Sequence, residues 1–153
     1  MRIAAGVLLI IVAIFNGIAG SGYALAGGAT AVAQDAVKDG KAMDGTELTA
    51  EQKAELEKAM KEAGANAPAA GGLAILGIFL LVMLGLQIAG AVTLFMSKAA
   101  GFVLIVGVLG IAAELAGPLA FSVGFGVTNI IGLVASVLAI LASRGYAGKA
   151  AAA

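Results

Sequence analysis

Long apolar segments, separated by short polar ones, set the pattern of this 153-residue chain. The apolar segments cover about residues 3–26, 73–97, 99–118 and 126–143. Because an α-helix rises 1.5 Å per residue and a hydrocarbon layer is roughly 30 Å thick, about 20 apolar residues are enough to cross it. The pattern therefore predicts an all-α integral membrane protein, an antiparallel bundle of four membrane helices in a single domain of residues 1–153.

The first apolar segment has two interpretations. One is a signal peptide, because Ala24-Leu25-Ala26 and Ala31-Val32-Ala33 both match the small-residue pattern of a cleavage site. However, the charge-free run from Ile3 to Gln34 is much longer than the roughly 7–15 apolar residues of a signal peptide, and only Arg2 supplies a positive charge before it. We therefore expect the segment to be retained as the first membrane helix.

A polar insert of residues 31–72 separates the first two apolar segments. It holds thirteen of the eighteen charged residues, five lysines and eight acids. Within it, Thr49-Ala50-Glu51-Gln52 matches a capping box and predicts a helix over residues 50–63. The narrow apolar stripe of this helix, which includes Leu48 and Leu56, is more typical of a helix resting on its own protein than of a partner site.

Small residues recur at spacings of three, four and seven in three of the four predicted membrane helices. Such a series leaves one face of a helix flat, so that the backbone of another helix can approach closely. A chain rich in alanine and glycine also produces such series by chance. We expect the helix-packing interface to contain Ala13, Gly17, Gly20, Ala24, Gly107, Gly110, Gly117, Gly132, Ala135 and Ala139.

Four polar side chains interrupt the apolar segments, namely Asn16, Gln87, Glu114 and Asn129. Helical geometry places all of these except Gln87 at nearly one depth, about 21–24 Å from the basic residue that ends each helix. Glu114 falls on the glycine stripe, so we expect it to face another helix rather than lipid. Because burial disfavours a charge, we expect its carboxyl group to be neutral and to bond to Asn16 or Asn129.

Three roles are open to this polar layer. It can hold the helices together by hydrogen bonds, it can carry protons or cations through Glu114, or it can contact a lipid or another ligand. An ionisable residue inside a membrane marks a functional site by default. We nevertheless expect hydrogen bonding between helices to be its role, and keep the other two as alternatives.

Composition narrows the possible functions. Apolar residues make up 61% of the chain and charged residues 12%, about half of their share in soluble domains. The absence of cysteine and histidine removes the commonest metal ligands and catalytic bases. The net charge is zero, and no basic stripe is present for nucleic acid. We therefore expect no enzyme activity, no metal or other cofactor, and no nucleic-acid partner.

Basic residues at the helix ends favour one orientation. Arg2, Lys98, Arg144 and Lys149 fall on the same side of a four-helix arrangement, with no acid among them. The positive-inside rule then places both termini in the cytoplasm and residues 31–72 outside, in a bacterial-type inner or plasma membrane. The five lysines of the insert argue for the opposite orientation, but most of them are farther from the helix ends.

Together, these features predict a non-catalytic accessory or structural subunit. Such a subunit would pack within the lipid bilayer, through its small-residue faces, against other membrane proteins or copies of itself. A component of a transporter, or of an ion or proton channel, that uses Glu114 is the alternative.

Overall fold

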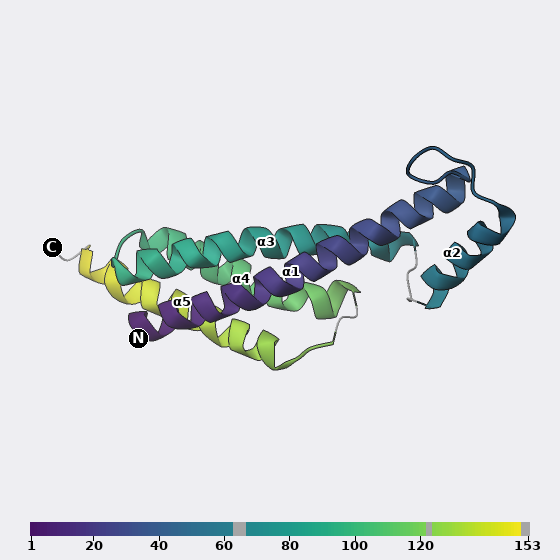
Figure 1. The fold of residues 1–153 in the computed structure, drawn as a ribbon. Helices are drawn as coiled ribbons and strands as arrows, with labels where there is room; N and C mark the ends of the chain where they lie inside the picture. Colours follow the sequence, from purple (N-terminus) through teal and green to yellow (C-terminus); the bar gives the residue numbers. More distant parts are fainter. Residues whose placement is uncertain (63–66, 122–123, 151–153) are drawn as a thin grey trace. The chain divides into compact units, whose positions relative to one another are not determined.

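The computed structural model describes residues 1–62, 67–121 and 124–150. Within these ranges the chain forms helices and no strand, and an isolated bridge between Lys41 and Glu47 is its only extended pairing. The helices are α1 (Arg2–Asp39), α2 (Ala50–Glu62), α3 (Ala67–Phe95), α4 (Ala100–Phe121) and α5 (Val127–Ala150) (Figure 1). The predicted all-α class is confirmed.

Four of these helices, α1, α3, α4 and α5, are long and apolar enough to cross a membrane. They correspond to the four apolar segments of the sequence. The exception, α2, is short and carries seven charged residues in its thirteen. The chain is therefore an integral membrane protein with four candidate spans among its described residues.

The first helix is longer than the sequence pattern predicts. We expected it to end near residue 26, but α1 continues through Asp39 without a break. Its additional residues are rich in alanine, the best helix former, and this outweighs their greater polarity. The helix ends before Gly40, whose φ of +68° is the left-handed conformation that commonly follows a helix. The first part of the predicted polar insert is therefore helical.

The third helix begins earlier than expected and has a well-defined end. It begins at Ala67 instead of residue 73, with Pro68 in its first turn, where a missing N–H costs nothing. Residue 63 of the predicted insert helix and residues 64–66 of the predicted polar insert lie outside the described residues. At its other end, Ser97 N–H donates to the Leu94 carbonyl and Lys98 N–H to that of Thr93, which is a Schellman motif.

Contacts divide the chain into two compact units. The first combines Met1–Gly20 with Phe79–Ala153, and the second is Ser21–Ile78. In the first unit, the start of α1, the end of α3 and the start of α4 share one buried cluster with the middle of α5, so α3 is antiparallel to both α1 and α4. The members of this cluster are Ala5, Leu9, Val12, Ala91, Leu94, Val103, Ala135, Ala139 and Ala142.

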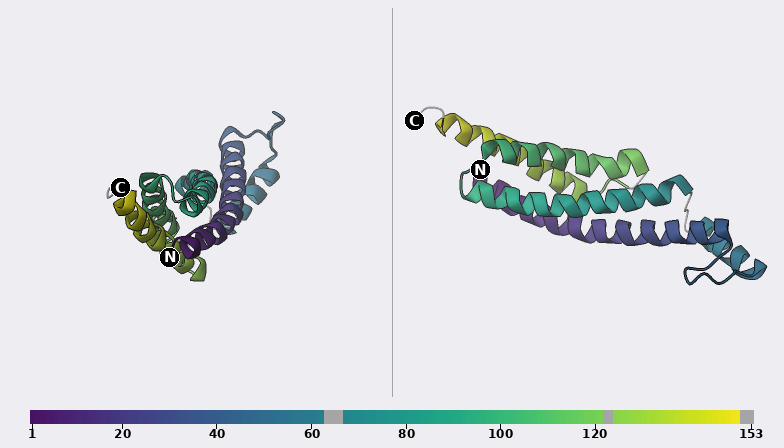
Figure 2. Two further views of the ribbon diagram at one scale, coloured as in Figure 1. Left: turned by 90° about the vertical axis from the view of Figure 1, so that its left-hand side faces the viewer. Right: turned by 90° about the horizontal axis from the view of Figure 1, so that it is seen from above.

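The first unit places small residues inside and large apolar residues outside. Alanine supplies five of the nine members of the buried cluster. Ile18, Ile105 and Val108, by contrast, are more than half exposed, as is expected of side chains that face lipid. Helices α4 and α5 lie side by side (Figures 1 and 2). Close helix packing rather than bulky side chains therefore holds this unit together.

The second unit contains the later part of α1, α2 and the start of α3. The predicted capping box of α2 is confirmed, because Gln52 N–H donates to Thr49 Oγ1 at 3.2 Å and Thr49 N–H donates to Gln52 Oε1 at 3.0 Å. Between α1 and α2, Leu48 N–H donates to the Gly40 carbonyl, and Ala42 N–H to that of Thr46, each at 2.8 Å. These bonds give the connecting loop a defined shape.

Candidate intramembrane polar site

The four polar residues predicted inside the membrane all lie in the first unit, one on each span. Asn16, Gln87 and Glu114 are buried, and Asn129 is partly exposed. They form two hydrogen-bonded pairs. Asn16 Nδ2 donates to Gln87 Oε1 at 3.1 Å, joining α1 to α3, and Asn129 Nδ2 donates to Glu114 Oε2 at 3.0 Å, joining α5 to α4. Every span thus contributes one side chain to a bond between helices.

A proline explains why Asn129 is needed beside Glu114. Pro118 lies inside α4 and has no N–H, so the carbonyl four residues earlier, that of Glu114, lacks its usual i→i−4 hydrogen bond. Asn129 Nδ2 donates to this carbonyl at 3.2 Å, in addition to the carboxyl group. In a membrane, where water cannot replace a missing bond, a neighbouring helix has to supply it. For the same reason α4 continues past Pro118 to Phe121, instead of ending at residue 118 as predicted.

The other end of the Asn129 amide fixes the start of α5. Gly126 N–H donates to Asn129 Oδ1 at 2.9 Å, and Asn129 N–H donates to the Gly126 carbonyl at 3.1 Å. This is a reciprocal cap on the first turn of α5, with Asn129 in the position where a capping box has Glu or Gln. One side chain therefore caps α5 and replaces the missing bond of α4. We refer to Glu114, Pro118, Gly126 and Asn129 as the α4–α5 clamp.

Glycines make room for the polar side chains between α4 and α5. A Cβ atom at Gly132 would collide with the Glu114 carboxyl group, and one at Gly110 would collide with Ser136 Oγ. At Gly107 it would approach the backbone carbonyl oxygen of Ser136 to 2.9 Å. The two helices can therefore lie this close only because these three positions carry no side chain.

Nearly all of the predicted small-residue positions pack inside the chain itself. Gly17 faces Leu84 of α3, and a side chain there would collide with it. The positions that are buried are Ala13, Gly20, Gly107, Gly110, Gly117, Gly132, Ala135 and Ala139. Ala24 is half-buried and belongs to the second unit. Consequently, the faces of α1, α4 and α5 that we expected to meet a partner meet the protein's own helices instead.

Sequence reasoning missed Ser136, which is fully buried next to the polar layer. A signal was available, since Asn129, Ser136 and Ser143 follow one another at intervals of seven on α5 and therefore share a face. Three buried polar atoms among the described residues have no hydrogen-bond partner: Gln87 Nε2, Glu114 Oε1 and Ser136 Oγ. Asn16 also lies near the Glu114 carboxyl group, but Oε1 of this group has no hydrogen-bond partner.

The polar site offers few groups for metal binding or acid–base chemistry. Among the described residues, no group of three or more His, Cys, Asp or Glu side chains could hold a metal ion. Glu114 is the only carboxyl group in the described part of the spans from Ala67 onward, and no second acid lies beside it. The site contains hydrogen-bond donors and acceptors, most of which join one helix to another.

Comparison of the chain with protein-family models, with curated proteins and with solved structures finds no match.

Proposed function

We propose that this chain is a non-catalytic accessory or structural membrane subunit, which packs against other membrane proteins or against copies of itself. The α4–α5 clamp is the observation that carries the proposal. It commits one carboxyl oxygen and the carbonyl oxygen of Glu114 to Asn129, as expected of a group that stabilises a fold. A carboxyl group that carries substrate or protons would instead need a partner that it can exchange.

Exposed small residues on α3 support a docking surface within the bilayer. Gly85 and Ala89 lie one helical turn apart, both are exposed, and a Cβ atom at Gly85 would have nothing within 4 Å. Lipid tails gain little from such a face, whereas a second helix can bring its backbone close to it. Since the small faces of α1, α4 and α5 are buried within the chain, α3 is the better candidate for contact with a partner.

The partner surface can be tested by blocking it. Gly85→Leu should shift the protein from a larger species to the mass of one chain, as measured by native mass analysis after mild solubilisation of its own membranes. Gly101→Leu, at another open glycine, is the matched control and should leave the larger species intact. A wild-type chain that is monodisperse at the mass of a single chain in native membranes would contradict the proposal.

We further propose that both termini lie in the cytoplasm, with residues 31–72 outside, in a bacterial-type inner or plasma membrane. Four spans return the chain to its starting side, and Arg2, Lys98 and Arg144 then flank the spans on that side. Because the chain has no cysteine, Glu47→Cys and Gly145→Cys each provide a unique label site. A membrane-impermeant thiol reagent applied to intact cells should label the first and not the second, and the reverse result would invert the orientation.

Transport through Glu114 is the second candidate, and the three buried polar atoms without partners favour it. Polar atoms left unbonded in a membrane are costly, and often mark a pathway. Proteoliposomes should show no proton or cation flux above that of protein-free vesicles if the accessory role is right. A flux that Glu114→Gln abolishes, while the fold is retained, would establish transport instead.

A further inference from the structure

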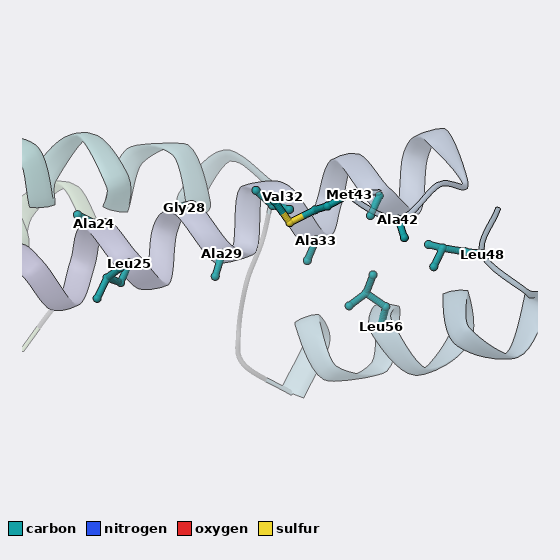
Figure 3. A pocket seen from close by; sticks show the side chains of 11 residues that line it. Ala24, Leu25, Gly28, Ala29, Val32, Ala33, Ala42, Met43, Leu48 and Leu56 are labelled. Carbon is teal, nitrogen blue, oxygen red and sulfur yellow. The ribbon is translucent and has the colours of Figure 1, made fainter. Parts of the chain in front are cut away.

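An apolar groove in the second unit has no role in the function proposed above. It lies between the later part of α1, the loop that follows, and α2, and has a volume of about 630 Å³. The side chains of Leu25 and Val32 line it from α1, those of Met43 and Leu48 from the loop, and that of Leu56 from α2 (Figure 3). Every residue that lines it is apolar, and four alanines and a glycine of α1 and a loop alanine complete it.

Hydrogen bonds of the loop hold one wall of the groove in place. Asp44 Oδ1 accepts bonds from the backbone N–H and the hydroxyl of Thr46, at 3.0 and 2.6 Å. Gly45, whose φ of +85° few other residues adopt, completes the turn with a bond from its N–H to the Ala42 carbonyl. Met43 and Leu48 are therefore held by a folded loop, and the groove exists before any ligand arrives.

The groove leaves large apolar side chains uncovered. Leu25 is 75% exposed, and Met43, which lies in the polar insert of residues 31–72, is 87% exposed. Exposed apolar area of this kind is unfavourable in water and commonly marks a binding surface. Both side chains contribute to the groove, so one occupant could cover the two together.

The same apolar face continues along α1 toward the membrane. Ile18, Leu25 and Val32 recur every seven residues, and therefore lie on one side of the helix, and all three are exposed. At 1.5 Å per residue, a 30 Å hydrocarbon layer that begins near Arg2 ends at about residue 22. Lipid that contacts Ile18 near the edge of the bilayer is therefore about two turns of helix away from the first groove residues, Ala24 and Leu25.

We propose that this groove binds the acyl chain of a membrane phospholipid, which enters from the bilayer along the Ile18–Leu25–Val32 face. Its lining offers neither a charge nor a polar side chain, which fits a hydrocarbon ligand and no polar one. The volume lies within the roughly 300–1,000 Å³ of typical small-molecule sites. An extended peptide fits less well, because its backbone needs hydrogen-bond partners that a wall of helix cannot provide.

The proposal depends on the membrane location of the chain and not on the accessory role, so either can fail alone. It is tested with the full-length protein in phosphatidylcholine vesicles containing a phospholipid that carries a photoactivatable diazirine on its acyl chain. After illumination, trypsin cleavage at Lys41 and Lys53 releases residues 42–53, which contain Met43 and Leu48. We expect a lipid adduct on this peptide, and on the next one, which contains Leu56.

Two variants of α1 make the result specific. Ala29→Phe fills the groove from its α1 wall and should reduce the adduct on residues 42–53 severalfold. Ala26→Phe adds the same ring on the same helix at an exposed position outside the groove, and should leave the adduct unchanged. Labelling of the membrane spans, which both variants should retain, verifies that each is folded and inserted.

Three outcomes would overturn the proposal. Labelling could be confined to the membrane spans, with none on residues 42–53. It could also be the same in Ala29→Phe as in the wild type, which would place the lipid elsewhere. Finally, Met43→Cys could form a disulfide-linked dimer efficiently in this otherwise cysteine-free chain, which would identify a second copy as the occupant.

Discussion

At the scale of single residues, the most informative side chain is Asn129. Its amide donates to both oxygen types of Glu114 and accepts from the backbone of Gly126. Glu114 is the more conspicuous residue in the sequence, because it is the only acid in its helix. However, it is Pro118 that leaves the backbone carbonyl of Glu114 without its usual helical hydrogen bond. In this geometry Glu114 is the acceptor and Asn129 is the donor of the hydrogen bonds between α4 and α5.

The α4–α5 clamp predicts a specific coupling between two substitutions. Asn129→Ala should destabilise the bundle by about 1 kcal/mol, because it removes two bonds between helices that are worth about 0.6 kcal/mol each in membrane proteins. In a Pro118→Ala background the helix supplies the missing bond to the Glu114 carbonyl itself, so the cost of Asn129→Ala should fall. Reversible unfolding in mixed micelles measures all four variants, and equal costs in both backgrounds would refute the clamp.

Two glycines of α4 give a second prediction at this scale. Gly107→Ala should destabilise the bundle by about 1–3 kcal/mol, because the new Cβ would press on the Ser136 carbonyl oxygen, and backbone cannot move aside cheaply. Gly101→Ala has open space and should be neutral or stabilising by up to about 1 kcal/mol, since alanine is the better helix former. The same unfolding measurement distinguishes them, and similar effects would mean that α4 and α5 are farther apart.

At the scale of elements, the sequence predicts correctly those helix ends that depend on a few neighbouring residues. The capping box of α2 depends on two residues three positions apart, and both of its bonds are present. The apolar pattern predicts an end for α1 about thirteen residues too early, because the helix continues where the apolar pattern ends. Helix formation by alanine continues where hydrophobicity stops. Similarly, the third apolar segment predicts an end at residue 118, whereas α4 continues past Pro118 because Asn129, on another element, donates to the carbonyl that the proline leaves without its usual partner.

The turn between α3 and α4 predicts a stabilising substitution. Ser97 has a φ of 55° at the Schellman position that glycine normally occupies. The left-handed conformation costs a residue other than glycine about 1–2 kcal/mol. Glycine removes this strain, but its greater freedom in the unfolded chain cancels part of the gain in folding free energy. Ser97→Gly should therefore stabilise the protein by about 0.5–1 kcal/mol in mixed-micelle unfolding. Ser97→Ala retains the strain and should give no gain, so an equal gain from both would argue against the motif.

The loop between α1 and α2 predicts a response to pH. The bonds from Thr46 lower the pKa of the exposed Asp44 carboxyl group below its ordinary value of 3.8. A lowered pKa means that the ionised form favours the folded loop, so this stabilisation is complete above the ordinary value and is lost as the pH falls through the lowered one. The Thr46 amide resonance should therefore be constant from pH 7 to 5 and titrate with a midpoint below 3.8. Asp44→Asn should abolish the transition, and a midpoint above 3.8 would contradict the bond.

At the scale of the whole molecule, composition and hydropathy were sufficient for the class and for the four spans. They were not sufficient for the site. Asn16, Gln87, Glu114 and Asn129 could be selected one at a time, because each is polar in an apolar segment. Their pairing depends on how the four spans pack, and the role of Ser136 depends on the absence of a side chain at Gly110. Such relations between elements have no counterpart in a local sequence pattern.

The α4–α5 clamp also has a consequence for how the chain enters the membrane. During synthesis α4 emerges before α5, and until α5 lies beside it the carbonyl of Glu114 faces hydrocarbon without a bond, at a cost of several kcal/mol. The later helix, for its part, is the least apolar of the four spans. Each helix therefore lowers the cost of burying the other, and we expect the translocation machinery to release them into lipid as a pair rather than one after the other.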